Sequence, residues 1–170
     1  MARILVIAAS ALVLAACGTT RPAKDVTAQS WSGDYRFQWQ ANTQAMRRGV
    51  PVPVPEKVEI RPVTTVSVKD VPGARLDNGP QWAISFVGEA GRPLPLRPFK
   101  ADGYRDFGWE QQRASGQIAC LESGAFMFLC RVPAGATISF GRSGDEQLTS
   151  KTGLFGVILH QGSFELTPLE

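Results

Sequence analysis

The sequence predicts an all-β protein: a single antiparallel β-sandwich or barrel with one disulfide hairpin. Short apolar stretches recur along the chain with turn signals about 8–12 residues apart, a spacing typical of sandwiches and barrels. Several stretches alternate strictly between apolar and polar residues, and no long segment has a convincing helical period. The length of 170 residues is enough for one domain with a sizeable core.

The chain opens with a short apolar run that ends in a cysteine. Arg3 supplies one positive charge, and residues 4–13 are apolar apart from Ser10. This length suits the central region of a signal peptide and falls short of the ~20 residues that a transmembrane helix needs. The run closes with Leu14-Ala15-Ala16-Cys17, and polar residues follow at once.

Leu14-Ala15-Ala16-Cys17 resembles the lipobox of bacterial lipoproteins. The resemblance implies that residues 1–16 are a signal peptide and that Cys17 begins the mature protein. Cys17 would then carry a diacylglycerol thioether and an amide-linked acyl chain such as palmitate, an effectively permanent membrane anchor. The alternative is an ordinary cleaved signal peptide with a free cysteine nearby. Gly18 is not the aspartate that retains enteric lipoproteins at the inner membrane, so the resemblance favours the outer membrane.

The expected mature chain consists of a tether and one domain. Residues 17–30 are polar and aperiodic after the cysteine, so we expect a lipidated N-terminus and a flexible tether. Residues 31–170 then form the periplasm-facing envelope β domain. Without Arg3 the chain keeps 17 basic and 15 acidic residues, a net charge near +2, which argues against a nucleic-acid partner.

The clearest strand signal lies in residues 31–39, where large rings alternate with polar side chains. Such alternation predicts a half-buried strand. The aromatic side consists of Trp31, Tyr35, Phe37 and Trp39. We interpret this side as part of the core. The alternative is a wall that binds a small apolar ligand or a glycan.

Two segments are interrupted by prolines: residues 50–55, where prolines alternate with valines, and residues 92–98. Each proline fixes its own φ and removes a donor from the strand ladder, so both segments should be extended and lie at the surface or an edge. One interpretation is a rigid connector, and the other is a strip that docks into an aromatic groove of a partner.

Further strands are expected along the rest of the chain, and the segment around residues 101–103 is expected to be a turn. Alternation or apolar runs predict strands within residues 57–71, 82–86, 137–140, 154–159 and 164–166.

Besides Cys17, the chain has two cysteines, Cys120 and Cys130, and an exported compartment permits a disulfide between them. Residues 122–124 predict a turn, and both cysteines fall on the same side of the resulting hairpin. A bridge across so short a loop contributes about 2–3 kcal/mol. The alternatives are two buried free thiols and, more weakly, a metal site, which lacks a Cys-x-x-Cys spacing.

No catalytic constellation, metal site or cofactor is predicted, apart from the covalent lipid. The single histidine, His160, ends an apolar strand, and no Gly-x-Ser-x-Gly motif supplies a nucleophile. The carboxylate pairs Asp106 with Glu110 and Asp145 with Glu146 are expected by chance among 15 acidic residues.

Two classes of function fit the sequence. The first is a membrane-anchored, non-enzymatic envelope lipoprotein whose β domain docks a periplasmic or outer-membrane protein. The second is a binder of a small apolar ligand or glycan through its aromatic strand faces. A hydrolase is a distant third. The two leading classes differ in whether the aromatic faces pack against one another or line an open cavity.

We predict that a Cys17→Ala variant remains an uncut or unlipidated precursor, because lipid attachment and processing both require the cysteine. Mass spectrometry and fractionation of the exported protein measure this. If the variant matures to the same mass and stays with the membrane, the lipoprotein interpretation is wrong.

Overall fold

The computed structural model describes residues 25–40, 44–49, 52–65, 71, 81–140 and 146–170. The first strands of the described part are β1 (Gly33–Trp39), β2 (Lys57–Pro62), β3 (Trp82–Val87), β4 (Leu94–Pro98) and β5 (Ala119–Ser123). They are followed by β6 (Met127–Arg131), β7 (Thr137–Phe140), β8 (Glu146–Thr149), β9 (Leu154–Ile158) and β10 (Gly162–Pro168). Short helices are α1 (Gln44–Arg47), the 3-10 turn η1 (Val63–Thr65), α2 (Ala101–Asp106) and α3 (Glu110–Ala114).

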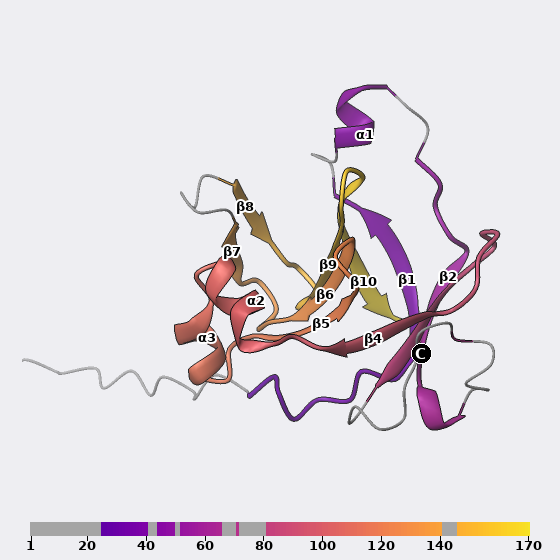
Figure 1. Cartoon of the computed structure of the whole chain (residues 1–170). Coiled ribbons are helices and arrows are strands. Elements are labelled where there is room, and N and C mark those ends of the chain that lie inside the picture. The colour runs from indigo at the N-terminus through magenta and orange to yellow at the C-terminus, as the bar shows by residue number, and fades with distance from the viewer. Residues whose placement is uncertain (1–24, 41–43, 50–51, 66–70, 72–80, 141–145) are drawn as a thin grey trace, which may run out of the picture.

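Eight of these strands form a closed antiparallel barrel (Figure 1). They follow one another around the ring in the order β1-β10-β9-β6-β5-β4-β3-β2, and the pairing of β1 with β2 closes it. The remaining two strands, β7 and β8, pair as a separate ribbon in the chain segment that connects β6 to β9. The all-β prediction is therefore confirmed, and of its two alternatives the barrel is the architecture observed.

Inward-facing side chains fill the barrel with a packed aromatic core. The rings of Phe37 on β1 and Phe164 on β10 stack with centroids 4.8 Å apart, and Trp39 packs edge-on against Phe37 at 4.9 Å. Trp39 is also held by its indole N–H, which donates a hydrogen bond to the carbonyl of Pro53 at 2.7 Å. The aromatic side of residues 31–39 faces this core, as the alternation predicts.

Gly156 on β9 makes room for the ring of Phe164. The two residues are cross-strand partners, and Phe164 is fully buried. A Cβ built on Gly156 would lie closer to that ring than real Cβ contacts allow, so the ring occupies the space that a side chain would take. An aromatic ring over a strand glycine restores the packing that the glycine alone would forfeit.

A second core lies outside the barrel, on the outer face of β5, β6 and β9. The helices α2 and α3 and the β7–β8 ribbon lie on this side of the barrel (Figure 1). Its buried residues are Phe99, Tyr104, Trp109, Ile118, Cys120, Cys130, Val132, Ile138, Leu148 and Phe155. Helices α2 and α3 were not predicted, and α2 occupies the segment around residues 101–103 that was expected to be a turn. Each helix is too brief to produce a helical period over several turns.

The predicted disulfide between Cys120 and Cys130 is present and belongs to this second core. The cysteines are directly opposite each other on β5 and β6, with Cα atoms 4.1 Å apart. They fall on one side of the hairpin, as their parity predicts. The turn lies at residues 124–126, slightly later than the expected 122–124.

The proline-containing segment at 92–98 is not the surface strip that we predicted. Its last five residues form β4, a strand of the barrel between β3 and β5, and Leu96 is fully buried. The prolines limit the pairing of β4, which has three partner pairs with β3 and two with β5, and the β4–β5 set is the smallest in the barrel. Of residues 50–55, the described ones form no strand, and Val54 is exposed.

Residues 25–30, which we expected to belong to the tether, pack against the domain. Val26 is buried, and its N–H donates a hydrogen bond to the carbonyl of Gly116 at 3.1 Å. Arg131 holds the following residues through hydrogen bonds to the side chain of Gln29 at 2.9 Å and to the carbonyl of Ser30 at 2.8 Å. The guanidinium also lies over the ring of Trp31, 5.1 Å from its centroid.

The leader, Cys17 and the first part of the expected tether lie outside the described residues, as do residues 41–43, 50–51, 66–70, 72–80 and 141–145.

Gly156→Ala should lower the free energy of unfolding by about 1–3 kcal/mol, because the new methyl group displaces the buried ring of Phe164. Urea denaturation measures the loss. Gly91→Ala is the matched control, since nothing lies within 4 Å of a Cβ at Gly91. Equal effects at the two positions would contradict the packing argument.

Candidate functional site

The candidate ligand face predicted from sequence lies mainly in the barrel core. Trp31, Tyr35, Phe37 and Trp39 are all buried. Only Phe37 and Trp39 also line a hollow, of about 220 Å³, at the mouth of the barrel where β1 ends. The sequence thus located the aromatic strand correctly, but the aromatic rings pack against one another more than they line open space.

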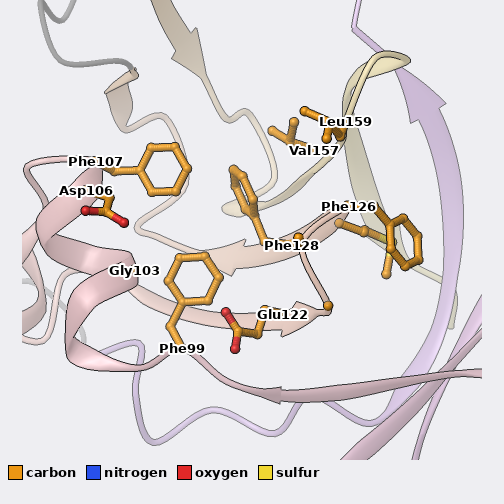
Figure 2. Close-up of a pocket in the computed structure, with 12 residues that line it drawn as sticks. Phe99, Gly103, Asp106, Phe107, Glu122, Phe126, Phe128, Val157 and Leu159 are labelled. Atoms are coloured by element: carbon orange, nitrogen blue, oxygen red, sulfur yellow. The ribbon is translucent and has the colours of Figure 1, made fainter. Parts of the chain in front are cut away.

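A larger hollow, which we call the aromatic groove, lies on the outer face of the barrel (Figure 2). Its volume is about 320 Å³. It is bounded by α2 and the residues on either side of that helix, by the β5–β6 turn, and by the ends of β6 and β9. The apolar residues that dominate its walls are Phe99, Phe107, Phe126, Phe128, Val157 and Leu159.

Outward-facing apolar side chains run along β6 and β9, and we call them the outer apolar stripe. The groove is the uncovered end of this stripe. Along β6 the exposure of outward side chains rises from fully buried Cys130, through half-buried Phe128, to Phe126 at 44 %. Along β9 it rises in the same direction, from fully buried Phe155 to Leu159 at 52 %. The helices and the ribbon cover the end of the stripe at Cys130 and Phe155 and leave the end at Phe126 and Leu159 open.

Two contacts fix the helical wall of the groove. The N–H of Cys120 donates a hydrogen bond to the hydroxyl oxygen of Tyr104 at 2.8 Å, which ties α2 to β5. The indole N–H of Trp109 donates to the carbonyl of Ser139 at 2.9 Å, and its ring stacks on Phe107 with centroids 4.5 Å apart. Burial raises the pKa of the Tyr104 phenol, so this hydroxyl stays neutral at physiological pH.

The rim of the groove is formed by two hairpin turns. The N–H of Leu159 donates a hydrogen bond to the carbonyl of Phe126 at 2.7 Å, which holds the β9–β10 turn against the β5–β6 turn. Gly124 has a φ of +58°, a conformation that glycine adopts without strain. Phe126 lines both the groove and the mouth of the barrel, so the two hollows adjoin at this rim.

Two carboxylates, Asp106 on α2 and Glu122 on β5, line the groove among the rings (Figure 2). Asp106 is exposed and Glu122 is half-buried. Within the described part of the chain, neither carboxylate forms a salt bridge or a hydrogen bond. The sequence pairing of Asp106 with Glu110 has no counterpart here, because Glu110 does not line the groove.

The other sequence candidates lie apart from the groove or outside the described residues. His160 is exposed at the β9–β10 turn, with a φ of 63°. Asp145 is not described. The described residues contain no cluster of three or more histidine, cysteine or acidic side chains that would hold a metal ion.

Sequence reasoning missed the groove because its rings come from separate elements. Phe99 precedes α2, Phe107 follows it, and Phe128 lies on β6. Only the shared parity of Phe126 and Phe128 with Cys130 signalled that these residues lie on one side of a hairpin. That parity does not say which parts of the side are covered.

A comparison with known protein families, curated proteins and solved structures finds no match to this chain. Among the described residues, no helix has the length and apolar character needed to cross a membrane.

Trp39→Ala should cost about 3–5 kcal/mol of the free energy of unfolding, because Trp39 is buried in the barrel core. Phe126→Ala should cost less, about 1 kcal/mol or below, since this residue is 44 % exposed. Urea denaturation of the two variants measures both. If Trp39→Ala keeps its stability but loses a bound lipid or sugar, the predicted face is a ligand site.

Proposed function

We propose that this chain is an envelope lipoprotein, anchored through Cys17, whose barrel domain binds a protein partner and carries out no reaction of its own. The leader supports the anchor, since Leu14-Ala15-Ala16-Cys17 resembles a lipobox. The partner is a periplasmic or outer-membrane protein, and the outer membrane is the favoured location.

The observation that carries the proposal is the open end of the outer apolar stripe. Phe126 and Leu159 are exposed beside a groove walled by further apolar side chains. Contiguous apolar surface of this kind marks interaction sites in water-exposed domains, because covering it removes apolar area from water.

The position of the anchor supports the same surface. Residue 25 is eight residues from Cys17, a distance of at most about 29 Å when extended. The described chain begins beside Gly116 and Arg131, at the end of the barrel opposite to the β5–β6 and β9–β10 turns. A short link from the membrane to that end directs the groove rim away from the lipid.

The alternative function is binding of a small apolar ligand or a glycan at the barrel mouth. Its support is the hollow lined by Phe37, Trp39 and Phe86, whose rings offer stacking surfaces. The hollow is smaller than the groove and its rings are already packed against Phe164, so we rank this alternative second.

Photocrosslinking in intact envelopes tests the proposal. The full-length protein carries p-benzoylphenylalanine in place of Phe126, Leu159 or, as the control, Arg36, which is exposed on β1 away from the groove. We expect a discrete protein adduct from the first two positions and none from the third. Equal adducts from all three, or adducts with lipid or glycan alone, would contradict a protein partner at the groove.

A further inference from the structure

The carboxylates of the aromatic groove restrict what can fill it. A purely apolar segment lying in the groove would cover Asp106 and Glu122 and leave both charges without a partner. Burying an unpaired charge is strongly unfavourable, whereas an occupant with a positive charge pairs with the carboxylates as it displaces water. The groove is therefore complementary to a group that is apolar and cationic at once.

The rings of the groove favour the same chemistry. Phe128 lies close to Phe99 and Phe107, with centroids 5.6 and 5.2 Å away, and these rings lie beside the carboxylates (Figure 2). Cations are attracted to the faces of aromatic rings. The protein uses such a contact internally, where the guanidinium of Arg113 lies 4.8 Å from the centroid of the Tyr104 ring.

The groove lacks a positive charge of its own. None of the described residues that line it is basic. The cross-strand neighbour of Glu122 is Arg97, which does not line the groove. A cation from outside is thus left to meet Asp106 and Glu122.

We infer that the aromatic groove recognises a lysine or arginine side chain of the partner, presented with apolar neighbours. The aliphatic stem of such a side chain packs on Phe128, Val157 and Leu159, and its charged head reaches the carboxylates. This inference rests on the proposed function, since it names the chemistry by which the groove would hold a protein partner.

Matched peptides test the inference on the full-length protein in nanodiscs of zwitterionic lipid, with empty nanodiscs as the blank. The probes are acetyl-leucyl-lysyl-leucine amide and the same peptide with norleucine in place of lysine, which keeps the stem and removes the charge. NMR titration of the groove resonances gives both dissociation constants. We expect the lysine peptide to bind about tenfold more tightly, because two weak ion pairs and a cation–π contact each add a severalfold gain.

Substitutions of the two carboxylates test whether they cause the preference for the lysine peptide. Asp106→Asn combined with Glu122→Gln should reduce the preference for lysine to less than twofold and leave binding of the norleucine peptide unchanged. Asp102→Asn is the matched control, because it removes a carboxylate from the same helix. Asp102 pairs with Arg105 and does not line the groove. The control should keep the full preference.

The other possible results show whether the inference or the proposed function is wrong. Equal binding of the two peptides, with crosslinks at residues 126 and 159 intact, overturns cation recognition and leaves the proposed function standing. If the lysine peptide binds more tightly but residues 126 and 159 give no protein crosslinks, the proposal of a protein partner is wrong. If tetramethylammonium binds as tightly as the lysine peptide and depends equally on Asp106 and Glu122, the ligand is a free quaternary ammonium ion. In that case recognition of a protein segment is wrong.

Discussion

The pairing of the first strand with the last is the constraint on which the rest of the structure depends. Five cross-strand pairs, from Tyr35 with Pro168 to Trp39 with Phe164, join β1 to β10. Without them the ring would be an open sheet with two long edges, and open edges pair readily with other chains. Closure also encloses Phe37 and Phe164, whose stacked rings fill the centre.

Closure determines what remains outside. Strands β6 and β9 are apolar on both faces, because inward Leu129 alternates with outward Cys130 on β6 and inward Leu154 with outward Phe155 on β9. A barrel covers only the inner face. The outer one needs separate cover, which the short helices and the β7–β8 ribbon supply over the disulfide but not over Phe126 and Leu159. The aromatic groove is what this incomplete cover leaves.

The groove therefore combines features that a core avoids. Its rings continue a buried apolar cluster, yet Asp106 and Glu122 lie among them. Packing explains the rings, and the proposed binding of a basic apolar segment would give the carboxylates a partner. The proposed anchor fits this arrangement, since it attaches at the opposite end of the barrel.

Local patterns in the chain were enough to predict most of the strands, though not β4 or β8, together with the buried side of the aromatic strand and the disulfide. The alternation of Tyr35, Phe37 and Trp39 and the parity of Cys120 with Cys130 depend only on the two-residue repeat of a strand. Ring closure, the use of residues 94–98 as a strand of the barrel, and the packing of residues 25–30 were decided by tertiary structure. Each depends on partners far away in sequence, such as Leu166 for Phe37 and Arg131 for Gln29. The groove belongs to this second group, because its position is set by where the cover over β6 and β9 stops, and no periodicity along either strand records that.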